Sequence, residues 1–208
     1  MIVTSDYHIS DNPIRQMEYD FCINKILENS FVDKVIFFSE TKNVKHIDKK
    51  IEYVIKNTRP TYRDFFEYFN LNYPNEIVLL SNLDIFFDET ISEVKNINLD
   101  SNVLALTRYD FKNNQWVLFN ENNVAQASQD TWVFKTPLRL ESLDCNFNLG
   151  VPGCDNRIAY EFYKSGYNVI NNSLKIKTYH KHDSNYRIWE VKKISPVPPP
   201  YLYVKPTL

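Results

Sequence analysis

Three short stretches of the sequence carry polar side chains of the types that bind metal ions or move protons. In the first, SNLDIFFD (81–88), Ser81 follows the apolar run IVLL, and Asn82 and Asp84 come shortly after it. An extended segment points residues two apart to the same side, and carboxylate and amide oxygens suit hard divalent cations. This pattern predicts a cation at Asp84 and, through the cation, a bound diphosphate. The alternative for Asp84 is an ordinary turn or capping carboxylate, and we expect a structural role for Asp88.

The second stretch, LKIKTYHKHD (174–183), ends in two histidines. In a strand, His180 and His182 would lie on the same side. Their imidazoles and the oxygens of Asn82 and Asp84 form a mixed donor set that suits Mn²⁺ (or Mg²⁺). A zinc centre is less attractive, because the sequence has no HExxH motif and no cysteine and histidine spacing typical of zinc sites. The alternative is that one histidine hydrogen-bonds a carboxylate.

The third stretch, NLGVPGCDNRIAYEF (148–162), places Asp155 at the start of a predicted helix. An aspartate at this position is ordinarily a cap that the helix dipole stabilises. However, Gly150 and Gly153, two of only three glycines in the chain, lie just before it. Glycines at this spacing indicate a tight approach of the backbone that presents Asp155 to a ligand.

Alternating strand and helix patterns position these three stretches. Apolar runs predict strands at 1–4, 34–40, 51–55 and 76–81. The first helix is expected to start after Asn12 and Pro13 and to bury a face formed by Ile14, Met17, Phe21 and Ile26. Thr61 and Asp64 predict a capping box for a second helix. Such alternation is typical of an α/β fold with a mostly parallel sheet, where ligands bind at the carboxyl ends of the strands.

The second half of the chain adds predicted strands at 103–111, 115–120 and 128–135, with a turn at 112–114. Asp130 and Trp132 lie at the start of the last strand. A carboxylate there can accept hydrogen bonds from sugar hydroxyls, and an aromatic ring can pack on a sugar face. The alternative is a turn aspartate and a core tryptophan.

Composition excludes several classes of protein. The 208 residues, 43% of them hydrophobic, suit one domain (1–194), followed by a proline-rich arm or a linker to a further domain (195–208). The 24 basic and 26 acidic residues balance without a basic block, which argues against a nucleic-acid partner. The sequence has three cysteines, no signal peptide and no apolar run long enough to span a membrane. We therefore expect a soluble, reduced, cytoplasmic protein.

Both familiar glycine-rich phosphate loops, GxGxxG and GxxxxGK, are absent from the sequence. A bound phosphate must then be held by a metal ion and arginines. Glycosyl transfer from a nucleotide diphosphate sugar fits these side chains. In that reaction a cation neutralises the departing diphosphate, and a carboxylate removes the proton of the attacking hydroxyl.

Taken together, SNLDIFFD, LTRYD, SQDTWVFK, GCDNRIAYEFYKSGYNV and YHKH resemble a compact glycosyltransferase of the GT-A fold over nearly the whole chain. Within that class the sequence looks most similar to the amino-terminal glycosyltransferase domain of chloroviruses, which are large algal viruses. The resemblance implies a Rossmann-like, mixed and mostly parallel sheet flanked by helices. It also implies a UDP-sugar donor such as UDP-rhamnose, a glycan acceptor, Mn²⁺, inversion at the anomeric carbon, and synthesis of a capsid-type glycan in the host cytoplasm.

The resemblance assigns the metal site to particular residues. The DxD metal motif of the family falls on Asn82-Leu83-Asp84, where an amide replaces the first carboxylate. Asp84 is therefore expected to bind the metal, while Asn82 reaches the ribose or the donor sugar. The late histidine ligand of the family falls on His180 or His182, and His182 is favoured because it lies nearer the end of the predicted strand.

The resemblance also assigns the catalytic and nucleotide-binding residues. The catalytic base at the helix start falls on Asp155, with Asp130 and Trp132 expected to hold hydroxyls and ring faces of the sugars. The nucleotide pocket is expected to comprise Thr4, Ser5, Asp6, Tyr7, Thr58, Arg59 and Tyr62. Further donor contacts are expected from Arg108 or Arg157.

Two functions of other classes stay open. Asn82 in the metal motif permits a noncatalytic glycan-binding or scaffold domain on the same fold, which would bind sugar without cleaving a nucleotide. A nucleotidylyltransferase that forms sugar nucleotides ordinarily has a glycine-rich, basic loop after its first strand. The segment SDYHISDNPIRQ (5–16) contains no glycine, which favours the glycosyltransferase.

Overall fold

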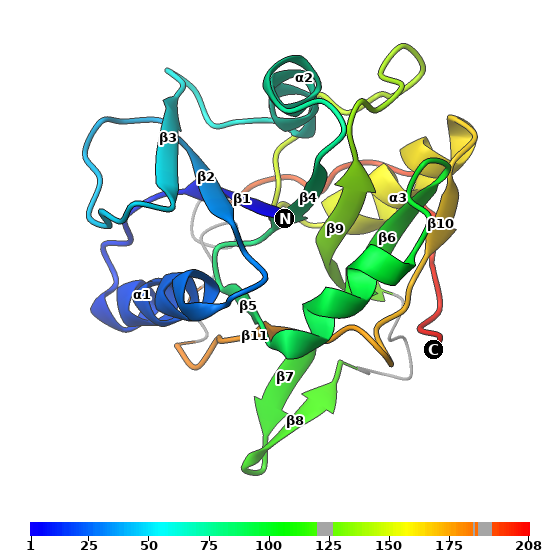
Figure 1. The fold of residues 1–208 in the computed structure, drawn as a ribbon. Coiled ribbons are helices and arrows are strands. Elements are labelled where there is room, and N and C mark those ends of the chain that lie inside the picture. The colour runs from blue at the N-terminus through cyan, green and yellow to red at the C-terminus, as the bar shows by residue number, and fades with distance from the viewer. Residues whose placement is uncertain (120–126, 185, 187–192) are drawn as a thin grey trace.

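The computed structural model of the chain describes residues 1–119, 127–184, 186 and 193–208. Its main sheet consists of β1 (Ile2–Tyr7), β2 (Lys34–Ser39), β3 (Ile51–Ile55), β4 (Ile77–Ser81), β6 (Asn102–Thr107), β9 (Gln129–Lys135) and β10 (Asn168–Ile170). The strand order is β10-β6-β9-β4-β1-β2-β3 (Figure 1). β9 runs antiparallel to β4 and β6, and the other described pairings of this sheet are parallel. β1 extends past the predicted end at Thr4, so Ser5 and Asp6 belong to the strand.

A smaller sheet has the order β5-β11-β7-β8. Its strands are β5 (Ile85–Phe87), β7 (Tyr109–Lys112), β8 (Gln115–Leu118) and β11 (Thr178–His180). The β7–β8 hairpin projects from the body of the protein, and its turn has Asn113 and Asn114 at positive φ, as expected for this residue type (Figure 1). β11 is much shorter than the strand predicted at 174–183, and Asn120 of the predicted strand 115–120 lies outside the described residues.

Within the described residues, four helical segments flank the main sheet: α1 (Pro13–Glu28), α2 (Tyr62–Asn72), the 3₁₀ helix η1 (Glu89–Asn96) and α3 (Cys154–Lys164). α2 and α3 pack on one face, while α1 and η1 pack on the other (Figure 1). The predicted caps are confirmed. Asn12 accepts a hydrogen bond from the first turn of α1, and Thr61 with Asp64 forms a capping box on α2. The predicted α/β architecture is therefore confirmed.

α1 buries a different face from the predicted one. Ile26 is buried as predicted, whereas the exposed fractions are 57% for Ile14, 69% for Met17 and 39% for Phe21. The buried face carries Arg15 and Glu18 as well as apolar residues. The apolar pattern predicted the wrong buried face because the charged residues Arg15 and Glu18 occupy two buried positions. Ion pairs compensate their charges there.

The observed register of α1 predicts a clear contrast between two substitutions. Met17→Lys changes an exposed side chain, so we expect the free energy of unfolding to change by less than about 0.5 kcal/mol. Ile23→Ala removes a fully buried side chain and should cost about 2–5 kcal/mol. Urea unfolding of both variants measures the difference. A larger loss for Met17→Lys than for Ile23→Ala would show that this register is wrong.

The C-terminal residues run across the start of α3. The amide of Val197 donates to the carbonyl of Pro152 at 2.8 Å, and the amide of Leu202 donates to the carbonyl of Asn156 at 2.9 Å. A Cβ atom on Gly153 would lie 2.8 Å from the Tyr201 hydroxyl and 2.8 Å from the Val197 carbonyl. Gly153 therefore permits the close packing of this segment on α3.

Two further findings bear on the sequence-based expectations. All three cysteines are buried and unpaired. Across the described part of the chain, none of the helices combines the length and apolar character needed to cross a membrane.

Candidate active site

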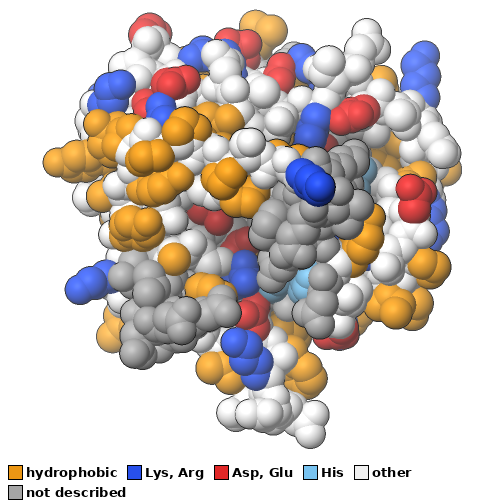
Figure 2. All heavy atoms as spheres, turned by 180° about the vertical axis from the view of Figure 1, so that it is seen from behind, with side chains coloured by type: hydrophobic (Ala, Val, Ile, Leu, Met, Phe, Trp, Pro, Cys, Tyr) orange, Lys and Arg blue, Asp and Glu red, His pale blue; other side chains and the backbone are white. Residues whose placement is uncertain are grey.

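A cavity of about 270 Å³ opens at the edge of the main sheet where β1 and β4 end. Because β9 is antiparallel to β4, its first residues lie at this same edge. The topology therefore brings Asp6, Asp84 and Asp130 to one cavity, together with arginine and histidine side chains. Figure 2 shows the corresponding hollow, where acidic, basic and histidine side chains meet near the centre of the face.

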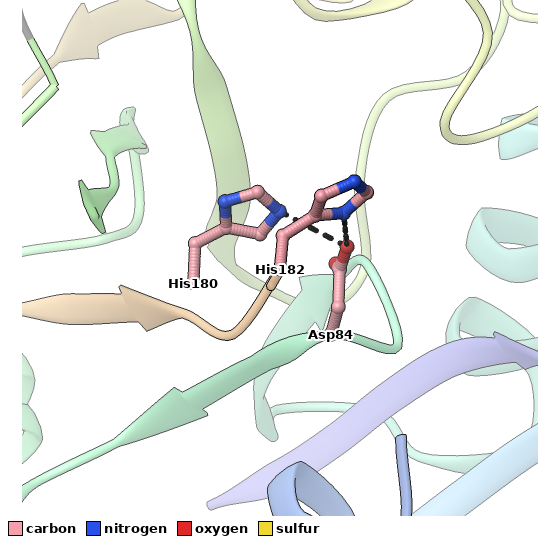
Figure 3. A group of neighbouring side chains, drawn as sticks. All are labelled: Asp84, His180 and His182. Carbon is pink, nitrogen blue, oxygen red and sulfur yellow. Dashed lines mark hydrogen bonds and ion pairs between the residues drawn. The ribbon is translucent and has the colours of Figure 1, made fainter. Parts of the chain in front are cut away.

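On one wall, Asp84 lies close to both histidines. His180 Nε2 lies 3.0 Å from Asp84 Oδ2, and His182 Nδ1 lies 3.6 Å from the same oxygen (Figure 3). One possible ligand atom from each of the three residues lies within 4.8 Å of the others. Asn82 through Asp84 form a turn rather than the expected extended segment, since the amide of Ile85 donates to the carbonyl of Asn82 at 3.2 Å. The turn aims Asp84 at the histidines, which come from the end of β11.

The chemistry of this cluster suits a divalent cation. His180 Nδ1 lies 2.9 Å from Asp110 Oδ1, and a carboxylate in that position fixes the tautomer that leaves Nε2 available as a ligand. Among the described residues, Asp84 Oδ1 and both ring nitrogens of His182 are buried without hydrogen-bond partners. Burial alone would raise the pKa of Asp84, but His180 and Arg15 hold it well below its usual range, so the carboxylate is ionised.

Arg15 and Glu18 of α1 support this wall, and sequence reasoning missed both. The Arg15 guanidinium donates to Asp84, to Glu18 at 2.7 Å and to the Tyr19 hydroxyl at 3.0 Å. Glu18 also accepts hydrogen bonds from the backbone amides just after His182, at 2.5 Å and 2.6 Å. The signal available in the sequence was the i, i+3, i+4 spacing of Arg15, Glu18 and Tyr19 on one helix face.

The opposite wall carries Asp130 and Asp155. Asp130 accepts hydrogen bonds from Asn82 Nδ2 at 2.8 Å and from Ser128 Oγ at 2.6 Å. Asp155 is partly exposed at the cavity and accepts a hydrogen bond from the Cys154 thiol at 3.2 Å. Burial of its carboxyl group, followed by repulsion from Asp130, raises the pKa of Asp155 well above its usual range. Asp155 is thus a more basic carboxylate than an ordinary aspartate.

The start of α3 presents Asp155 to the cavity. The residue that precedes the helix is Gly153, with φ +80° and no capping side chain, so Asp155 is not a helix cap. Gly150 has φ +70°, and a Cβ atom on it would lie 3.3 Å from Asn82 Oδ1 and 3.6 Å from Arg59 Nη2. This glycine turn thus lies close to Asn82 and Arg59, and the expectation that it presents Asp155 to a ligand stays a prediction.

Arg108 links the two walls. Its Nε atom donates to Asp110 at 2.9 Å, and its Nη1 atom donates to Asp130 at 3.0 Å. Asp110 in turn pairs with His180, so a continuous series of polar contacts runs from the metal cluster to Asp130. Asp110 was not recognised in the sequence, where its place two residues after Arg108 in the segment TRYD was the available signal.

A third side of the cavity belongs to residues predicted to bind the nucleotide. Arg59 Nε donates to Asp6 Oδ2 at 2.8 Å, and Arg59 Nη2 donates to the Leu149 carbonyl at 2.5 Å. Ser5 and Leu83 also line the cavity. The Ser5 hydroxyl is buried and has no hydrogen-bond partner among the residues that the structure describes. These side chains are placed to contact a ligand, while their roles stay predictions.

Several other predicted contacts are not brought to the cavity. The Thr4 hydroxyl donates to the Ile36 carbonyl, and the side chains of Tyr7 and Tyr62 are buried. Trp132 is fully buried and packs against Phe162, so the expectation that it contacts a sugar was wrong, and its alternative as a core residue is confirmed. These four side chains are buried in the protein interior, where aromatic and β-branched residues serve packing.

Two further predicted donor contacts also lie elsewhere, since neither residue is among those that line the cavity. Thr58 is exposed. Arg157 pairs with Asp144 and with the buried Glu161.

Comparisons with known proteins identify the fold. No family model matches the sequence, and no curated protein is significantly similar to it. Among solved structures, the mannosyltransferase PcManGT from Pyrobaculum calidifontis in complex with GDP-Man and Mn²⁺ has a TM-score of 0.59 at 14% identity, covering 92% of this chain and 60% of that one. Residues 1–349 of S. aureus TarS in complex with UDP-GlcNAc give 0.56 at 14% identity, covering 90% of this chain and 59% of that one.

A nucleotidyltransferase has a similar fold. The 2-C-methyl-D-erythritol 4-phosphate cytidylyltransferase of Francisella tularensis has a TM-score of 0.52 at 14% identity, covering 92% of this chain and 96% of that one. The chain thus spans about 60% of the PcManGT and TarS chains and nearly all of the cytidylyltransferase. These similarities show a GT-A-like, Rossmann-related fold, and the function has to be argued from the site.

Proposed function

We propose that this protein is a metal-dependent glycosyltransferase that uses a nucleotide diphosphate sugar. The observation that carries the proposal is the presence of a cation-binding cluster and a carboxyl group of raised pKa on opposite walls of one cavity. The two glycosyltransferases of similar fold support it, since one was solved with GDP-Man and Mn²⁺ and the other with UDP-GlcNAc.

In the proposed reaction, Asp155 accepts the proton of the acceptor hydroxyl as that oxygen attacks the anomeric carbon of the donor. Its raised pKa makes it a stronger base once it has lost its own proton. Asp84, His180 and His182 would hold Mn²⁺ or Mg²⁺, which when bound neutralises the charge of the leaving diphosphate. A single displacement of this kind inverts the anomeric carbon.

Asn82 and Asp130 are proposed to orient the donor sugar. Asn82 Nδ2 donates a hydrogen bond to Asp130 at 2.8 Å. The polar atoms of both side chains can form hydrogen bonds with sugar hydroxyls in place of this contact. On the third side, Ser5, Asp6 and Arg59 would contact the nucleoside. We propose UDP as the nucleotide and rhamnose as the sugar, with a glycan acceptor, on the basis of the resemblance to the chlorovirus domain.

Calorimetric titration of UDP tests the proposal. The titration uses metal-stripped protein with and without Mn²⁺, and GDP serves as the control nucleotide. We expect UDP to bind only with Mn²⁺ and GDP to bind at least about tenfold more weakly, because a nucleoside pocket that hydrogen-bonds one base leaves its polar groups unpaired with another. If GDP binds and UDP does not, the proposed donor becomes a GDP-sugar instead of a UDP-sugar. A lack of binding by both nucleotides would leave a noncatalytic glycan-binding domain.

A nucleotidylyltransferase is the second candidate, favoured by the 96% coverage of the cytidylyltransferase. That reaction releases pyrophosphate from a nucleoside triphosphate, whereas glycosyl transfer releases a nucleoside diphosphate. Incubation with UTP or CTP, Mn²⁺ and sugar phosphates, followed by a pyrophosphate assay, separates the two. We expect no pyrophosphate, because the segment after β1 lacks the glycines that let a backbone wrap a triphosphate.

A further inference from the structure

Arg15 is a buried cation whose position the proposed reaction has not yet used. Only 8% of the residue is exposed, and it lines the same cavity as the metal cluster. We propose that Arg15 is an exchangeable counter-ion: it neutralises Asp84 when the cation is absent, and it donates to the diphosphate of the donor when the cation occupies Asp84. This inference rests on the proposed function, which it extends to a residue of α1.

The contacts of Asp84 are the first step of the argument. Arg15 Nη2 and His180 Nε2 both contact Asp84 Oδ2, whereas Asp84 Oδ1 has no hydrogen-bond partner among the described residues. A guanidinium and a divalent cation at one carboxylate repel each other, and the cavity is partly shielded from water, which strengthens that repulsion. Binding of the cation to Asp84 must therefore weaken the contact with Arg15.

The second step concerns where the Arg15 guanidinium can go. Glu18 holds Nη1 at 2.7 Å and the Tyr19 hydroxyl accepts from Nε at 3.0 Å, so the inner half of the guanidinium stays fixed to α1. The Nη2 donor contacts Asp84, and both residues line the cavity. A diphosphate beside the cation would lie next to this donor, and guanidinium groups bind phosphate oxygens with charge-assisted hydrogen bonds.

The third step is the connection that Glu18 makes to the other metal ligand. Glu18 accepts from the amides of Asp183 and Ser184, directly after His182, while it also pairs with Arg15. One carboxylate thus anchors the cation of α1 and the backbone that carries His182. The Arg15 guanidinium is held in place while its contact with Asp84 is exchanged, because its anchor does not depend on Asp84.

Two binding measurements on Arg15→Gln test the proposal. Mn²⁺ is titrated into the metal-free protein without nucleotide, and UDP or GDP is titrated in saturating Mn²⁺. We expect the Mn²⁺ affinity of the variant to rise about tenfold, because a competing positive charge is gone. We expect the nucleotide affinity to fall about 10- to 100-fold, because a charge-assisted hydrogen bond to phosphate is lost. Opposite signs of the two effects distinguish an exchangeable counter-ion from structural damage, which weakens both.

Two variants complete the design. Arg15→Lys retains the charge but loses the planar donor geometry, so its Mn²⁺ affinity should stay within about threefold of the wild type while its nucleotide affinity falls about tenfold. This variant keeps the test usable if Arg15→Gln does not fold. Arg63→Gln, on α2 and outside the cavity lining, is the control and should change neither affinity.

The outcomes separate this proposal from the proposed function. Unchanged or weaker Mn²⁺ binding by Arg15→Gln, with wild-type protein that does bind Mn²⁺, would overturn the role of Arg15 and leave the metal site intact. For a folded Arg15→Lys, nucleotide binding equal to that of the wild type would also overturn it. If wild-type protein does not bind Mn²⁺, the metal site is wrong, and the exchange at Asp84 fails with it.

Discussion

Replacement of Asp155 by asparagine is expected to abolish turnover and to raise the thermal stability of the protein at the same time. The amide cannot accept the acceptor proton, and loss of a general base typically lowers a rate by about 10²–10⁴-fold. Nucleotide binding should be nearly unchanged, because Asp155 lies on the wall opposite the metal cluster. Steady-state rates with the donor identified by calorimetry give the first readout. A variant that keeps half of the wild-type rate would rule out Asp155 as the base.

The gain in stability follows from the sign of the pKa shift. The pKa of Asp155 is raised in the folded protein, so its contribution to stability is fully present below the pKa of an unfolded aspartate, about 3.9, and is lost as the pH rises through the folded pKa. At neutral pH the wild type therefore carries a penalty that asparagine lacks. We therefore expect the Tm of Asp155→Asn to lie above that of the wild type at neutral pH.

Thermal unfolding across pH separates this effect from a general improvement in packing. The advantage of Asp155→Asn in Tm should be small near pH 4 and should grow toward pH 8. Asp100→Asn serves as the control, because this aspartate is exposed and pairs with Lys135 on the surface. An advantage of Asp155→Asn that does not vary with pH would show that the carboxyl group is not the cause.

The second large effect is expected at Asp84. Asp84→Asn removes the anionic ligand of the cation cluster while keeping the shape of the side chain. We expect Mn²⁺-dependent nucleotide binding to weaken at least about 100-fold, since loss of even an indirect supporting group typically costs 10- to 100-fold in metal affinity. Calorimetry with Mn²⁺ and the wild-type nucleotide measures the loss, after circular dichroism has shown that the variant is folded.

Asp88→Asn is the matched control for Asp84→Asn. Asp88 caps η1 and accepts a hydrogen bond from the Tyr179 hydroxyl at 2.6 Å, as expected of the structural role predicted for it. This variant should change stability by less than about 0.5 kcal/mol, because asparagine caps a helix about as well as aspartate, and it should keep its metal affinity. If Asp88→Asn abolishes Mn²⁺-dependent binding and Asp84→Asn does not, the metal site has been assigned to the wrong carboxylate.

Local signals in the sequence predicted much of the fold. Asn12 before Pro13, and Thr61 before Asp64, each satisfy backbone amides within one turn, so neighbouring residues alone determine these helix starts. The run IVLL predicted β4 because a strand covered on both faces has apolar residues at successive positions. The same topology predicted that Asp84 lies just past the carboxyl end of this strand, and the structure places it there, in the lining of the cavity.

The rest of the site depended on contacts between distant parts of the chain. Arg15 and Glu18 are polar, so their burial is understood only once Asp84 is known to lie against α1. Asp110 becomes significant only through its pairing with His180, 70 positions away. Trp132 has the residue type of a sugar platform, but only the three-dimensional structure shows that its ring is fully buried and packs against Phe162 of α3. A single sequence does not show which distant residues are in contact, so these features could not be predicted from it.

The three-residue strand β11 has a consequence for the dynamics of the site. It joins the smaller sheet through β5 and β7, and the residues around it contact partners that are 96 positions away at Asp84 and 165 away at Glu18. A short strand held by such distant partners can open while the main sheet stays folded. Amide hydrogen exchange at 178–184 should therefore be faster than in β1 and β4, and should slow when Mn²⁺ and nucleotide bind, because ligands stabilise the closed form by mass action.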